Sequence, residues 1–126
     1  MTLRERTRRH LPVLIWSLVV AVLLAAPGDE IPEVGAWKWL DKPAHALLFA
    51  VHCGLLARSL ASSGMRDRGL RAAAVVSGLY AVLLEAAQIR VPGRSWEWWD
   101  LVADLVGIAV AALFIAGRRA RLRGAS

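Results

Sequence analysis

Cysteine is nearly absent from this sequence of 126 residues: Cys53 stands alone, so an internal disulfide scaffold is excluded. The sequence also lacks a glycine-rich phosphate-binding loop, a cysteine-based metal-binding pattern and a G-x-S-x-G nucleophile motif. Acidic residues are scarce, since 10 Asp and Glu stand against 16 Lys and Arg and leave a net charge of +6. A long linker, a low-complexity tract and an internal repeat are missing as well, so we predict a single domain, residues 1–126.

Apolar residues, in contrast, make up 57% of the chain, compared with roughly 45–50% in soluble domains. This content excludes intrinsic disorder, and the long apolar runs argue against a nucleic-acid-binding protein despite the positive charge. Four apolar segments of 16 to 18 residues lie at 11–26, 44–60, 72–89 and 101–116. With a turn added from its flanks, each can cross a hydrocarbon core of about 30 Å. We therefore predict an all-α polytopic membrane protein, a bundle of four transmembrane helices near residues 11–26, 43–60, 72–89 and 100–116.

Basic residues predict how this bundle is oriented. The N-terminal arm, the connection at 58–71 and the C-terminal tail each carry four arginines, whereas the other two connections together hold four lysines or arginines. Because cytoplasmic loops are enriched in Lys and Arg, we predict that both termini are cytoplasmic and that the connections 29–42 and 90–100 lie outside. The outer connections also contain five of the six tryptophans, as expected at a membrane interface: Trp37, Trp39, Trp96, Trp98 and Trp99.

The arginine-rich start followed by an apolar run also resembles a secretory signal peptide. However, residues 23–27 offer no pair of small residues suited to cleavage, so an uncleaved first helix is favoured.

Polar side chains that are costly inside a membrane gather near the outer ends of the predicted helices. They are Asp41, Lys42, His45, Glu85, Gln88, Arg94, Asp100 and Asp104. Ionisable groups at this depth indicate a functional site. Helical spacing groups the side chains into three stripes: His45, Phe49 and His52; Glu85 and Gln88; and Asp100, Asp104, Gly107 and Ala111. If these stripes face inward, they close a polar pocket at the outer mouth of the bundle.

The pattern Asp41-Lys42-x-x-His45-x-x-x-Phe49, followed by Glu85-x2-Gln88-x5-Arg94-x5-Asp100 and Gly107, resembles the VanZ-like family of small bacterial membrane proteins. The resemblance covers residues 41–111, whereas the first helix adds only general likeness. It implies a multi-pass protein of the bacterial cell (inner) membrane, in a family linked to low-level resistance to the lipoglycopeptide teicoplanin. Asp104 departs from the family pattern, which often has Asn there, and so adds a negative charge.

Several of these residues also have structural interpretations. Asp41, which precedes Lys42-Pro43, and Asp100 both stand where acids commonly cap a helix, and Pro43 would suit a first turn. His52 lies deeper on the His45 stripe and fits a packing histidine.

Glu85 is the hardest of the group to explain by packing. A carboxylate at this depth must pair with Arg94, Lys42 or His45, or carry a proton. An ion-pair network that only ties three helices together is an alternative for the whole group. The side chains of His45, Glu85, Asp100 and Asp104 are chemically suited to a metal. Their spacing is not diagnostic, however, so the sequence predicts no metal and no cofactor.

Three functions fit the pattern. The favoured one is a binding or resistance protein whose outer-leaflet pocket engages an amphiphile, either a lipid-linked envelope precursor or a lipoglycopeptide. Lys42 and Arg94 would meet phosphate or carboxylate, and the rest of the binding site would comprise Asp41, Gln88, Asp100 and Asp104. The alternative is a membrane-embedded enzyme acting on a lipid-linked substrate, with His45 and Glu85 as candidate catalytic acid–base groups. A proton pathway through His45 and His52 is the weakest, because no acid continues it. Membrane lipids are the expected partners and nucleic acid is not; the sequence assigns no oligomeric state.

Overall fold

The computed structural model describes residues 2–26 and 36–126, and this part of the chain forms four helices: α1 (Leu3–Leu24), α2 (Ala36–Ser62), α3 (Arg66–Gln88) and α4 (Trp98–Gly124). The described residues contain no strand, so the all-α prediction is confirmed. Each helix is long and apolar enough to cross a membrane. The lengths and composition of the helices therefore indicate a multi-pass membrane protein.

The helices are longer than the apolar segments because their charged flanks are helical too. Helix α1 already begins at Leu3, where Thr2 and Glu5 form a capping box. The main-chain N–H of Thr2 donates to Oε2 of Glu5 at 2.8 Å, and that of Glu5 donates to Oγ1 of Thr2 at 3.3 Å. Helix α4 continues to Gly124 through an arginine-rich stretch, since arginine is a good helix former.

The start of α2 corrects two predictions. Because α2 begins at Ala36, Asp41 and Pro43 both lie inside the helix; Asp41 is not its cap and Pro43 is not in its first turn. A proline in a helix removes one main-chain hydrogen bond, which membrane helices tolerate. The part of the predicted outer connection at 29–35 lies outside the described residues, as do the side chains of Trp37 and Trp39.

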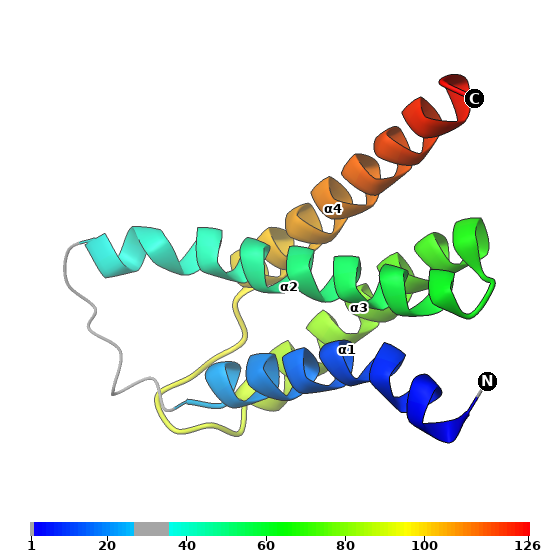
Figure 1. Ribbon diagram of the computed structural model, residues 1–126. Helices are drawn as coiled ribbons and strands as arrows, with labels where there is room; N and C mark the ends of the chain where they lie inside the picture. Colours follow the sequence, from blue (N-terminus) through cyan, green and yellow to red (C-terminus); the bar gives the residue numbers. More distant parts are fainter. Residues whose placement is uncertain (1, 27–35) are drawn as a thin grey trace.

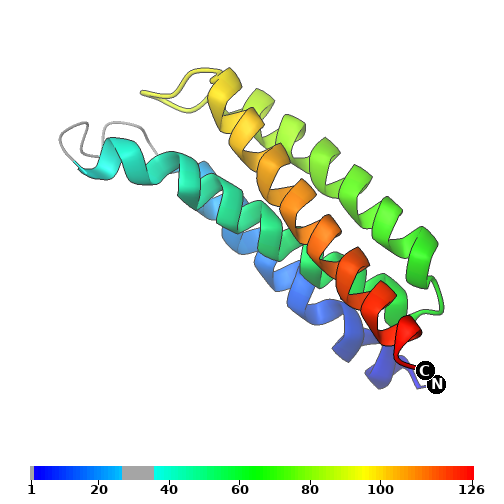
Figure 2. The same cartoon turned by 90° about the horizontal axis from the view of Figure 1, so that it is seen from above.

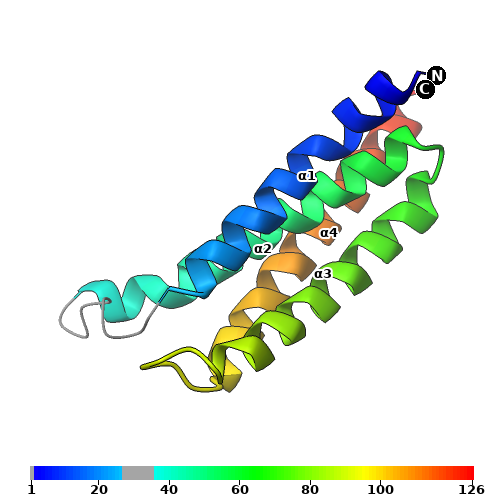
Figure 3. The same ribbon diagram turned by 90° about the horizontal axis from the view of Figure 1, so that it is seen from below.

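The helices run up and down, with α2 in contact with α1, α3 and α4 (Figure 1). A short turn joins α2 to α3, and Gly64 adopts a left-handed conformation there with φ of 86°. Both termini lie at the end of the bundle that holds this turn, on opposite sides of it (Figure 1); they overlap when the bundle is seen from above or below (Figure 2 and Figure 3). The connection between α3 and α4 lies at the opposite end, as expected when consecutive helices are antiparallel.

Burial in this bundle differs from that in a soluble protein, because the outside is apolar and the interior holds polar as well as apolar side chains. Large apolar side chains cover the outside: Leu113 is 73% exposed and Phe114 is 69% exposed. The buried positions include eight polar side chains: His45, His52, Ser59, Ser77, Glu85, Gln88, Asp100 and Asp104. This distribution suits a bundle surrounded by lipid, in which polar groups face the interior.

Helices α2 and α4 approach most closely at Gly107. A Cβ atom added at this position would lie 2.7 Å from the carbonyl carbon of Ala46 and 2.8 Å from its Cα. Small residues permit this kind of backbone contact between membrane helices. Gly107 thereby sets the spacing between the two helices that carry most of the polar residues described next.

Candidate functional site

A polar cluster lies at the end of the bundle opposite the termini, where α2 and α4 begin and α3 ends. We define it by seven residues: Asp41, Lys42, His45, Glu85, Glu97, Asp100 and Asp104. The buried members are His45 from α2, Glu85 from α3, and Asp100 and Asp104 from α4, each at most 3% exposed. Three helices thus bring to one place six of the eight residues that the sequence singled out.

His45 lies at the centre of the polar cluster, and both of its ring nitrogens face carboxylates. Its Nδ1 is 2.9 Å from Oδ1 of Asp104, a hydrogen bond in which the ring N–H donates to the carboxylate. Its Nε2 is 3.7 Å from Oδ2 of Asp100 and 3.8 Å from Oδ1 of Asp41. A carboxylate on one ring nitrogen fixes the orientation of an imidazole. His45 is therefore held by α4, although it belongs to α2.

Lys42 neutralises part of the negative charge at the rim of the polar cluster. Its Nζ donates to Oε2 of Glu97 at 2.9 Å and to Oδ2 of Asp41 at 3.2 Å, and it also bonds to Asp100. An ammonium group has three donors, so these carboxylates occupy all of them. Lys42 therefore has no donor left for the phosphate or carboxylate of a ligand.

Glu85 is 1% exposed and only partly hydrogen-bonded. Its Oε2 accepts a long hydrogen bond of 3.4 Å from the main-chain N–H of Glu97. Oε1 of Glu85 and Oδ2 of Asp104 are both buried and have no hydrogen-bond partner among the described residues. One ligand atom of His45, one of Glu85 and one of Asp104 lie within 4.8 Å of one another. Of the three partners expected for Glu85, His45 is therefore the one that lies close to it.

Arg94, one of the three partners expected for Glu85, does not pair with it. Its Nε donates instead to the main-chain oxygen of Ala26 at 3.1 Å. Gln88 likewise bonds to the end of α1: its Nε2 donates to the main-chain oxygen of Leu24 at 2.9 Å. Both side chains tie the end of α3 and the following connection to the end of α1, outside the polar cluster.

His52 belongs to a second buried polar group, nearer the middle of α2. Its Nδ1 is 2.8 Å from Oγ of Ser77 and its Nε2 is 3.0 Å from Oγ of Ser17. The Ser17 hydroxyl donates to the main-chain oxygen of Val13 at 2.7 Å, so it accepts from Nε2. The imidazole also stacks on Tyr80, with ring centroids 5.1 Å apart. His52 thus has the partners of a packing histidine.

Sequence reasoning did not identify Glu97, Ser17 or Ser77 as partners of the buried groups. Glu97 precedes Asp100 by three residues, a spacing that places two side chains on one face of a helix start. That signal was present in the sequence. The serines gave no comparable signal, because single serines are common in membrane helices.

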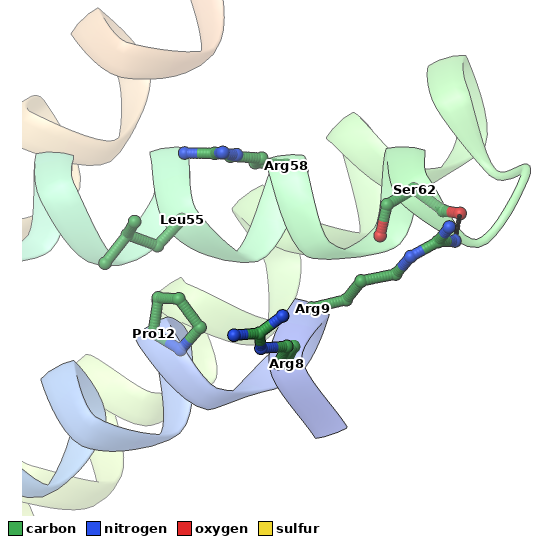
Figure 4. A pocket seen from close by; sticks show the side chains of 6 residues that line it. All are labelled: Arg8, Arg9, Pro12, Leu55, Arg58 and Ser62. Atoms are coloured by element: carbon green, nitrogen blue, oxygen red, sulfur yellow. Dashed lines mark hydrogen bonds between the residues drawn. The ribbon is translucent and has the colours of Figure 1, made fainter. Parts of the chain in front are cut away.

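Two surface hollows lie near the termini and not at the polar cluster. One, of about 250 Å³, lies between α1 and α2 and is lined by Arg8, Arg9, Pro12, Leu55, Arg58 and Ser62 (Figure 4). The other, of about 420 Å³, is lined by Arg4, Thr7, Arg8 and Leu11. The side chains of the polar cluster contact one another and line neither hollow.

Comparison of the chain with protein-family models, with curated proteins and with solved structures finds no match. Function must therefore be argued from the site itself. The fold and the site define a four-helix membrane protein with a buried cluster of carboxylates around one histidine.

Proposed function

We propose that this protein is a VanZ-like protein of the bacterial cell membrane and that its polar cluster engages an amphiphile in the outer leaflet. The amphiphile is an envelope lipid, a lipid-linked precursor or a lipoglycopeptide of the teicoplanin type, and the cellular role is resistance or envelope homeostasis. The observation that carries the proposal is the convergence of His45, Glu85 and Asp104 from three helices. Buried ionisable groups of this kind are costly, and function is the default reason to retain them.

The orientation is supported by where the arginines lie. Both termini and the turn between α2 and α3 are at one end of the bundle, and the flanking segments there carry twelve arginines. By the positive-inside rule this end is cytoplasmic, and the polar cluster lies toward the outer leaflet. Trp98 and Trp99, which are 70% and 74% exposed at the start of α4, suit the outer membrane interface.

The charge of the polar cluster suggests how a headgroup would bind. Of the two cations expected to meet an anion, Lys42 is occupied by carboxylates, which leaves Arg94, outside the polar cluster in the connection before α4, to bind a phosphate. The acidic side chains of the polar cluster favour a cationic group. A headgroup or glycopeptide that carries an amine as well as an anion matches this arrangement best.

A membrane-embedded enzyme acting on a lipid-linked substrate is the second candidate. The 2.9 Å bond between His45 and Asp104 favours it, because an imidazole oriented by a carboxylate is a common general base. Glu85, with one oxygen that no described residue binds, would be the second acid–base group.

Lipid retention and turnover separate the two candidates. The protein would be reconstituted with phosphatidylglycerol, phosphatidylethanolamine or undecaprenyl phosphate, and retained lipid and product would be measured by mass spectrometry. We expect Arg94→Ala to reduce retention, whereas Arg90→Ala, in the same connection, leaves it unchanged. Turnover that His45→Gln abolishes while retention persists would identify an enzyme, since loss of a general base lowers rates about 10²–10⁴-fold. If no substitution alters retention or turnover, the polar cluster is only structural and the proposal fails.

A further inference from the structure

We propose that His45, Glu85 and Asp104 bind a divalent transition-metal ion of the Zn²⁺ type. One ring nitrogen of His45 and one carboxylate oxygen from each acid lie within 4.8 Å of one another. Bonds of about 2.0–2.2 Å to zinc place tetrahedral ligands about 3.4 Å apart. An inward movement of the three side chains, with release of the proton from the ligating ring nitrogen of His45, would complete this coordination. The proposal does not rest on an amphiphile being the ligand of the polar cluster.

Two buried oxygens support this assignment independently of the clustering. Oε1 of Glu85 and Oδ2 of Asp104 have no hydrogen-bond partner among the described residues, although Glu85 is 1% exposed and Asp104 is 0% exposed. A buried carboxylate oxygen without a donor costs free energy. A cation bound by the two acids would offset this cost.

Charge balance points the same way. The polar cluster places five carboxylates around one ammonium group, Lys42, and one imidazole, His45. Removing unpaired charges from water costs several kcal/mol for each ion. Lys42 contacts Asp41, Glu97 and Asp100 but neither Glu85 nor Asp104. The inner acids therefore have the greater need of a cation.

A second group of three, Asp41, His45 and Asp100, has similar spacing but is a poorer site. Both of its acids already bond to Lys42, whose positive charge opposes a second cation nearby. Neither acid of the inner group contacts Lys42, so this repulsion is weaker there.

The donor set selects the class of metal. Mg²⁺ and Ca²⁺ prefer oxygen ligands only, whereas one imidazole with two carboxylates suits Zn²⁺ or Mn²⁺. Three protein ligands leave a coordination position for water or substrate, the arrangement of catalytic zinc sites. Such an ion would activate a bound water in the membrane-embedded enzyme considered above.

The test is metal binding by the full chain in detergent, with Zn²⁺ as the probe and no lipid substrate. Protein stripped with a chelator would be dialysed against Zn²⁺ or Mg²⁺, and bound metal counted by atomic absorption. We expect about one Zn²⁺ per chain, bound more tightly than Mg²⁺. Glu85→Gln and Asp104→Asn should weaken Zn²⁺ binding by more than about tenfold, because even outer-shell changes cost 10–100-fold. Glu97→Gln, the same substitution at an exposed member of the polar cluster, should leave it unchanged.

X-ray absorption of the wild-type zinc complex supplies a readout that needs no variant to fold. We expect nitrogen and oxygen ligands, including one imidazole, and no sulfur, since Cys53 is not among the proposed ligands. Failure of the wild-type chain to retain Zn²⁺ would overturn the proposal. It would mean that protons, and not a metal ion, neutralise the buried acids. Sulfur ligation would overturn it too, as would unchanged binding in both Glu85→Gln and Asp104→Asn. None of these results bears on lipid retention, so the proposed function succeeds or fails separately.

Discussion

Gly107→Ala is the smallest substitution that should separate α2 from α4. The added Cβ would lie 2.7 Å from the carbonyl carbon of Ala46, where ordinary contacts begin at 3.4 Å. The obstacle is helix backbone, so the two helices must move apart by about an ångström. Overpacking of this kind costs about 1–3 kcal/mol, and a rigid backbone contact belongs near the upper end. The better helix propensity of alanine returns about 1 kcal/mol, which leaves a net loss of about 1–2 kcal/mol.

The assay is thermal and denaturant unfolding in detergent, with Gly117→Ala as the matched control. Gly117 lies further along the same helix, and a Cβ there would meet no atom within 4 Å. We expect the control to be neutral or slightly stabilising, because only the propensity gain applies. The same movement would separate His45 on α2 from Asp104 on α4, so zinc binding should weaken in Gly107→Ala but not in the control. Equal stability of the two variants would refute the close approach of α2 and α4.

Two further predictions concern topology and the anchoring of α1. Single cysteines would be introduced at Gly35 and at Arg66 in a Cys53→Ala background and labelled with an impermeant thiol reagent. We expect position 35 to react from outside intact cells and position 66 not to react. Labelling at position 66 would contradict the orientation. Gln88→Leu removes the 2.9 Å bond to the main-chain oxygen of Leu24 and should destabilise the protein by about 0.5–1.5 kcal/mol; an unchanged melting temperature in detergent would show that this bond does not hold α1.

The fold was predictable because each span is a long apolar run, a signal that needs no knowledge of neighbouring helices. The ends of the helices were not. Arginine-rich flanks carry no apolar signal, and yet the capping box at Thr2 starts α1 well before the first apolar run. Similarly, Pro43 suggested a helix start, whereas α2 continues through it from Ala36.

The site shows the same division between periodic and irregular structure. Helical periodicity placed His45, Phe49 and His52 on one face, and all three are buried in the bundle. Periodicity cannot predict how a connection folds, so the partners of Lys42 and Arg94 were missed. Glu97, just before α4, binds Lys42 at 2.9 Å, while Arg94 turns to the end of α1. Those two contacts decide which charges remain unpaired.

Asp104 is the position where the sequence departs from the VanZ-like family that we propose for it, and this departure has chemical consequences. An Asn there could still accept the hydrogen bond from Nδ1 of His45 through its Oδ1, as Asp104 does at 2.9 Å. Its amide nitrogen, however, would replace Oδ2 with a donor, whereas Oδ2 of Asp104 is a buried acceptor with no partner among the described residues. The Asn form would carry no negative charge and would therefore need no cation. Asp104→Asn should consequently lose zinc binding without losing stability, which distinguishes a metal ligand from a residue that only ties α4 to α2.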